Sequence, residues 1–323
     1  MLRRIISAAA ALALAVSIST GCSAQSRDDS RLSIVCTVYP LYDWTSQIVS
    51  GAPDTDLTYL MDNGADLHNY QPTADDMMTV SDCDVFIYVG GESDKWVDSA
   101  LKNARNKDMK VIDLMDVLGS RLREEELKEG MQSTEEEEED SGNEPEFDEH
   151  IWLSLRNAED CTVAIASILS DADSEHAEIF KNNASAYIDE LAALDDDYKE
   201  LTDSAENRTL IFGDRFPFRY LVDDYGLDYY AAFKGCSSES EASFETVTFL
   251  AGKCDELGAE YVFTIDGSDC SIADAVIAST KSKSQKVLTL NSMQSVKAAD
   301  GKPAPSYIEL MTDNLNTLKE ALN

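Results

Sequence analysis

Apolar and polar positions form short alternating blocks along the first part of the chain. Runs rich in β-branched and aromatic residues predict four strands, which are Ser33–Tyr39, Leu57–Met61, Val85–Val89 and Lys110–Leu114. Helical spacing lies between them, over Leu41–Val49, from Pro72 onward and over about Lys95–Asn103. This alternation is typical of a parallel sheet with crossover helices.

The same order returns near the carboxyl end. Four more strands are predicted, at Thr209–Phe212, Asp228–Phe233, Tyr261–Ile265 and Lys286–Leu290. Helical spacing again separates them, and a last amphipathic helix starts near Tyr307. The chain therefore contains two similar α/β halves.

A long helical region, 157–204, lies between the two halves. Its apolar residues recur mostly at intervals of three or four residues and form one amphipathic stripe. These residues are Ile179, Phe180, Tyr187, Ile188, Leu191, Leu194, Tyr198 and Leu201. We therefore expect an α/β fold with two lobes, each a parallel sheet with crossover helices, joined by a long rigid connecting helix.

Composition divides the chain further. We expect a signal peptide at 1–21, a tether at 22–32, an N-terminal α/β lobe at 33–156, the connecting helix region at 157–204 and a C-terminal α/β lobe at 205–323. Within the first lobe, 124–149 is dominated by acidic residues with Ser, Gly and Pro, which predicts a mobile acidic loop.

The amino terminus has the order of an export signal. Arg3 and Arg4 precede an apolar stretch, and small residues then lead to Cys22. This resembles the lipobox of bacterial lipoproteins, although an aliphatic residue is usual where Ser19 stands. The resemblance implies that Cys22 is lipidated and anchors an extracytoplasmic protein; the alternative is an ordinary signal peptide cut nearby.

The formal charge of −36 excludes some partners. It argues against nucleic acid, whose phosphates would be repelled, and against electrostatic adhesion to anionic lipid. Six cysteines follow Cys22, without a C-x-x-C pair, so a thiolate zinc knuckle is not expected and no disulfide pairing can be deduced.

Candidate chemistry lies at the carboxyl ends of the predicted strands, where ligands bind in open α/β sheets. These polar residues are His68, Asp214, Glu239, Asp266 and Asn291, and His150 stands where the acidic segment ends. Just beyond His68, Thr73 and Asp76 predict a capping box. Two imidazoles with carboxylates would suit zinc better than magnesium or calcium. Solvated histidines are the alternative, and His176 is expected at the surface.

Three segments resemble the solute-binding lipoproteins of zinc and manganese ABC importers. The segment 37–42 is similar to their first strand and turn, 64–73 to the segment of their first metal-binding histidine, and 150–153 to that of their second. The resemblance implies that His68 and His150 bind Zn²⁺, or alternatively Mn²⁺, as transported ligand. It also implies an ABC importer permease as partner, and we expect a monomer.

The second half departs from the family pattern. Gly213 stands where the third ligand, His or Glu, is usual, and Asn291 aligns with the last acidic ligand. We take Asp214 and Asp266 as substitutes, with Glu239 behind them.

Two other functions stay open. A zinc-dependent hydrolase could use two histidines, one carboxylate and an open position, but the sequence has no G-x-S-x-G, Walker A, G-x-G-x-x-G or H-E-x-x-H motif, so we expect no enzyme. The same scaffold could instead bind a non-metal solute or act as a surface adhesin.

Overall fold

A computed structural model describes residues 31–132, 146–237, 241–297 and 303–322. The chain divides into two units, Met1–Arg31 and Leu32–Asn323, and both lobes belong to the second. The signal peptide, Cys22, Glu239 and residues 133–145 of the acidic loop lie outside the described residues. In the described part of the chain, no helix combines the length and apolar character needed to cross a membrane.

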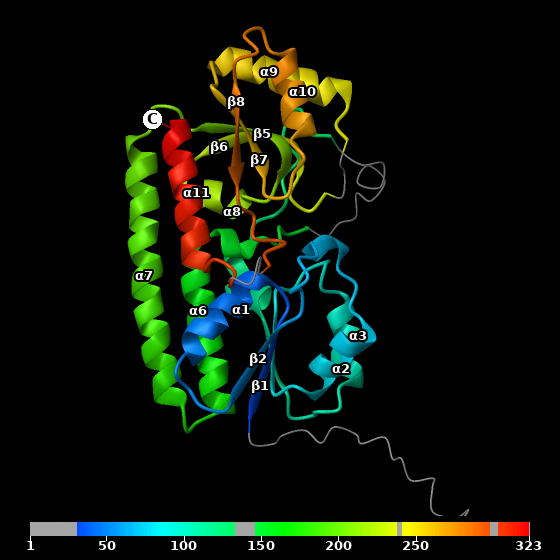
Figure 1. Ribbon diagram of the computed structural model, residues 1–323, viewed down its shortest axis with the longest axis vertical. Coiled ribbons are helices and arrows are strands. Elements are labelled where there is room, and N and C mark those ends of the chain that lie inside the picture. Colours follow the sequence, from blue (N-terminus) through cyan, green and yellow to red (C-terminus); the bar gives the residue numbers. More distant parts are fainter. Residues whose placement is uncertain (1–30, 133–145, 238–240, 298–302, 323) are drawn as a thin grey trace, which may run out of the picture. The chain divides into compact units, whose positions relative to one another are not determined.

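The N-terminal lobe is built on one parallel sheet (Figure 1). Its strands, in the spatial order β2-β1-β3-β4, are β1 (Leu32–Cys36), β2 (Thr55–Tyr59), β3 (Val85–Tyr88) and β4 (Lys110–Asp113). Its helices are α1 (Tyr39–Val49), α2 (Ala74–Asp82), α3 (Trp96–Asn103) and α4 (Leu114–Leu118), with short 3-10 turns η1 (Leu67–Asn69), η2 (Gly119–Arg121) and η3 (Ile151–Leu153). The first strand ends earlier than predicted, because Pro40 already lies in the first turn of α1.

The C-terminal lobe repeats this plan with a second parallel sheet, in the order β6-β5-β7-β8. Its strands are β5 (Thr209–Phe216), β6 (Asp228–Lys234), β7 (Tyr261–Ile265) and β8 (Lys286–Leu290). Its helices are α8 (Arg219–Tyr225), α9 (Phe244–Leu257), α10 (Ser271–Ser279) and α11 (Tyr307–Leu322). The two parallel sheets confirm the predicted fold class.

The connecting region differs from the single helix that its length suggested. It consists of α6 (Leu155–Ala172) and α7 (Ala177–Ser204), which pack side by side (Figure 1). The break falls where Asp173 accepts hydrogen bonds from the backbone of Glu175 and His176. The predicted stripe belongs to α7, which packs against α1 of the first lobe and α11 of the second. Helix α7 thus contacts both lobes.

One hydrophobic core extends through both lobes. Trp44, Trp152 and Tyr307 are fully buried and belong to it. Trp152 donates its indole N–H to the carbonyl of Ser292 over 2.8 Å, and Tyr307 donates its hydroxyl to the carbonyl of Trp152 over 2.6 Å. These bonds join the segment after His150 to the end of the C-terminal lobe.

The hydroxyl of Tyr307 should therefore contribute to stability. We expect Tyr307→Phe to lower the free energy of unfolding by about 1–3 kcal/mol, because the buried carbonyl of Trp152 loses its phenol donor. Urea denaturation of the metal-free protein measures this loss. Tyr198→Phe is the matched control: its hydroxyl donates to the carbonyl of Met311, which lies inside α11 and can keep a helical partner. Equal losses in the two variants would contradict this account.

Candidate metal centre

His68 is held by the 3-10 turn η1, which follows β2. The side chain of Asp66 caps this turn by accepting the backbone N–H of His68 over 3.0 Å. The predicted capping box follows at the start of α2. The hydroxyl of Thr73 accepts the backbone N–H of Asp76, and the carboxylate of Asp76 accepts the backbone N–H of Thr73. The ring of His68 is only 7% exposed. The loop therefore presents this histidine toward the protein interior.

His150 lies where the acidic segment meets η3, and it is fully buried. One carboxylate oxygen of Asp148 accepts both its backbone N–H, over 2.8 Å, and its ring Nδ1–H, over 2.9 Å. Because Asp148 can only accept here, the neutral ring carries its proton on Nδ1 and its lone pair on Nε2. Asp148 thus fixes the tautomer of His150.

The two histidines face each other through Nε2. These nitrogens are 3.1 Å apart, which is close to the separation of roughly 3.3 Å that two nitrogen ligands have on a tetrahedral zinc. The Nδ1 of His68 meets the hydroxyl of Ser93 at 3.0 Å, and the backbone N–H of Ser93 donates to Glu149 over 2.8 Å. With Nδ1 as donor, His68 also directs a lone pair at this point. Two lone pairs meeting in a buried space favour a cation between them.

The pKa values of the two histidines are shifted in opposite directions. Burial, followed by the neighbouring His150, lowers the pKa of His68 to about 3. Burial also acts to lower the pKa of His150, but the carboxylate of Asp148, with further help from Glu125 and Glu149, outweighs it and raises that pKa. Thus His68 is neutral, as a metal ligand must be, at any ordinary pH.

Two side chains of the C-terminal lobe complete the cluster. Cys236, in the turn after β6, places its sulfur so that it and a nitrogen from each of His68 and His150 all lie within 4.8 Å of one another. Gln294, after β8, is 3% exposed. Its amide Nε2 lies 3.2 Å from Nε2 of His68 and contacts Nε2 of His150. The site is therefore built by both lobes.

The carboxylates expected from the sequence lie elsewhere. Asp214 is not on a loop but inside β5, at a register shift between Phe212 and Arg215, where it accepts the backbone N–H groups of Arg215 and Ile265. Asp266 accepts both the N–H and the hydroxyl of Ser292. Neither belongs to the group of His68, His150 and Cys236, so their role as ligands stays a prediction.

Gly213 and Asn291 have structural surroundings of their own. A Cβ at Gly213 would come within 2.5 Å of the Cα of Ala273, so no larger residue fits there without a shift. Asn291 exchanges hydrogen bonds with Asn314 of α11 and accepts the N–H of Met293. His176, expected at the surface, is partly exposed and pairs with Asp173 at 2.6 Å.

Cys236 and Gln294 were missed by the sequence analysis. Both follow the ends of C-terminal strands, the same signal that selected Asp214, Asp266 and Asn291. The prediction considered only acidic residues, histidine and Asn291 at these strand ends, although a thiol and a side-chain amide can also bind metals.

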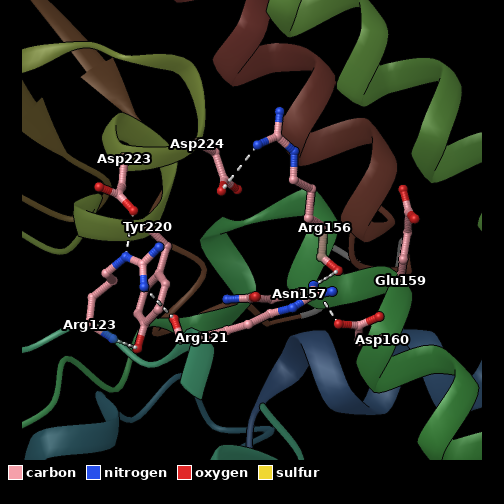
Figure 2. A pocket seen from close by; sticks show the side chains of 9 residues that line it. All are labelled: Arg121, Arg123, Arg156, Asn157, Glu159, Asp160, Tyr220, Asp223 and Asp224. Atoms are coloured by element: carbon pink, nitrogen blue, oxygen red, sulfur yellow. Dashed lines mark hydrogen bonds and ion pairs between the residues drawn. The ribbon is translucent and has the colours of Figure 1, made fainter. Parts of the chain in front are cut away.

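A hollow of about 370 Å³ lies beside α6 and α8 (Figure 2). Its three arginines each pair with a carboxylate, as Arg121–Asp160, Arg123–Asp223 and Arg156–Asp224. Because Asp160, Asp223 and Asp224 are already engaged by these guanidinium groups, they are not available as metal ligands, and we do not take this pocket as a rival metal site.

Asp94 follows Ser93, which contacts His68, and its titration should make the stability of the protein depend on pH. Its buried carboxylate accepts the N–H groups of Val89 and Gly90, each over 3.0 Å, next to Ser93. Burial, and also the charge of Glu149, raise the pKa of Asp94 to about 7. The native state therefore holds a proton that the unfolded chain loses near pH 4.

Because of this proton, we expect the free energy of unfolding to fall as the pH rises from about 4 to about 7. Above about pH 7, Asp94 should cause no further change. In Asp94→Asn, which cannot ionise, the slope should be shallower. Urea midpoints of the metal-free protein at pH 5, 6, 7 and 8 measure it, and parallel curves for the two proteins would contradict the assignment.

Comparisons with known proteins find relatives that are named for zinc binding and zinc uptake. The zinc-binding lipoprotein AdcA of Streptococcus pneumoniae is 31% identical over 303 residues, which cover 93% of this chain and 57% of that protein. This chain thus spans little more than half of the length of AdcA. The high-affinity zinc uptake system protein ZnuA of Bacillus subtilis is 27% identical over 315 residues, covering 94% of this chain and 91% of that protein.

Among solved structures, the Zn(II)-bound ZnuA-like domain of Streptococcus pneumoniae AdcA has a TM-score of 0.70 and 27% identity, covering 90% of this chain and 99% of that domain. The family described as zinc-uptake complex component A, periplasmic, matches residues 34–321. Nearly the whole compact unit Leu32–Asn323 is included in that match. The chain therefore belongs to the family of the periplasmic zinc-uptake complex component A.

Proposed function

We propose that this protein is an extracytoplasmic, lipid-anchored binding protein that captures Zn²⁺ between its two lobes and delivers it to an ABC permease. The observation that carries the proposal is the pair of Nε2 atoms of His68 and His150, which lie 3.1 Å apart on buried side chains. The relatives support zinc as the ligand, since they are named for zinc binding and zinc uptake.

The family is one of zinc-uptake components and not of enzymes, which removes the hydrolase alternative. The protein would hold its metal reversibly and change no covalent bond in it. Side chains from both lobes meet at the site, so a small separation of the lobes would remove ligands from the metal. Release to the permease would follow from such a movement.

Isothermal titration tests the proposal. The compact unit 32–323, stripped of metal, would be titrated with Zn²⁺ and, separately, with Mn²⁺. We expect one tight zinc site and weaker manganese binding, because imidazole ligands favour zinc. A tighter manganese site would overturn the choice of metal, and no tight site for either would favour the non-metal or adhesin alternative.

The anchor needs its own test. Expressed with its own leader in a bacterial host, the full chain should collect in the membrane fraction, and Cys22→Ser should release it into the soluble extracytoplasmic fraction. Equal fractionation of the two proteins would contradict lipidation at Cys22.

A further inference from the structure

We propose that the thiolate of Cys236 is the third zinc ligand, so that the two histidines and one sulfur hold the metal. This inference rests on the proposed function and specifies its site. Its basis is the convergence of three donor side chains from separate segments, with donor atoms all within 4.8 Å of one another. A thiolate and two imidazoles are a ligand set that zinc accepts in proteins.

The backbone before Cys236 is shaped for close approach to His150. A Cβ on Gly235 would lie 3.2 Å from the Cε1 of His150, 3.2 Å from a carboxylate oxygen of Asp148 and 2.9 Å from the carbonyl oxygen of Phe216. Only a glycine leaves room for the turn to pack directly on the imidazole. The backbone N–H of Cys236 is in turn fixed by the carboxylate of Glu125 over 3.0 Å. The turn is therefore held where the thiol reaches the two rings.

A second observation concerns a buried carboxyl group beside Nδ1 of His68, the ring nitrogen that does not face His150. Glu149 is 2% exposed, and its Oε2 has no hydrogen-bond partner among the described residues. That oxygen lies 3.8 Å from Nδ1 of His68. A buried carboxylate oxygen without a partner is costly, and a divalent ion held by His68 would offset that cost. Asp148 places a further carboxylate behind His150.

The thiolate also supplies what the other ligands lack. His68 and His150 are neutral ligands, and Asp214 and Asp266 lie outside the cluster. When Zn²⁺ binds, it takes the place of the thiol proton of Cys236, and that proton passes to solvent. One bound negative charge then remains against the two positive charges of the metal. Sulfur ligands favour zinc over manganese, so Cys236 would also contribute to the choice of metal.

X-ray absorption of the zinc-loaded unit 32–323 tests the proposal without any substitution. We expect one sulfur neighbour at about 2.3 Å beside nitrogen and oxygen neighbours at about 2.0–2.1 Å. Loading with Co²⁺ gives a second readout, because a thiolate ligand produces a charge-transfer band in the near ultraviolet. In Cys236→Ser that band should vanish, and zinc affinity should fall by at least about tenfold to a hundredfold, since even indirect partners of a ligand have effects of that size.

Cys270→Ser is the matched control, because Cys270 is likewise a half-buried free thiol but lies outside the cluster. It should keep both the band and the affinity. Tight binding that depends on His68 and His150, with no sulfur neighbour and no change in Cys236→Ser, would overturn the role of Cys236 and leave the proposed function standing. A wild-type protein without tight zinc binding would overturn both.

Discussion

Zinc binding should be lost when His68 and His150 are both replaced by alanine. Each substitution removes an Nε2 lone pair from a buried site. Removing an indirect partner of a ligand already weakens metal binding by about 10- to 100-fold. Two direct ligands should therefore cost at least about 10²- to 10⁴-fold in affinity, as isothermal titration of unit 32–323 would measure.

His176→Ala is the control for this experiment. His176 also pairs with a carboxylate, Asp173, through its Nδ1, but it is partly exposed and lies between α6 and α7, away from the cluster. Its loss should leave zinc affinity unchanged. If the double variant still bound zinc tightly, the metal would have to lie elsewhere, and the predicted ligands Asp214 and Asp266 would be the next residues to replace.

Most of the fold could be predicted because it depends on local patterns. Strands such as β3 and β7 are short runs of apolar and aromatic residues, and both sheets are parallel as the spacing of the elements implied. The connecting region was predicted less well. No proline or glycine marks the break between α6 and α7; it depends on the hydrogen bonds of Asp173. Hydrogen bonds of this kind do not change the spacing of the apolar residues, so the sequence pattern could not reveal the break.

The site was predicted in part for a similar reason. His68 and His150 were found because few histidines exist and both stand in distinctive segments. Cys236 and Gln294 depend on how two lobes meet, which the position of a residue along its own strand does not reveal. Asp214 was placed on a loop because its strand continues through a register shift that resembles a strand end in sequence.

Asp148 should tune the metal affinity without touching the metal. In Asp148→Asn, one amide oxygen can still accept the backbone N–H and the Nδ1–H of His150, but the negative charge is lost. The imidazole then becomes a weaker electron donor, and zinc affinity should fall by about 10- to 100-fold, which is about 1.4–2.8 kcal/mol. Asp148→Ala, which also removes the orienting bonds, should fall further.

Both variants would be titrated with zinc at pH 8, because the carboxylate of Asp148 raises the pKa of His150, and at lower pH its removal would also relieve competition by protons. The matched control is Asp173→Asn, which removes the same kind of charge from the same kind of contact at His176. It should leave zinc affinity unchanged. If Asp148→Asn bound zinc as tightly as the wild type, the strength of His150 as a zinc ligand would not depend on this carboxylate.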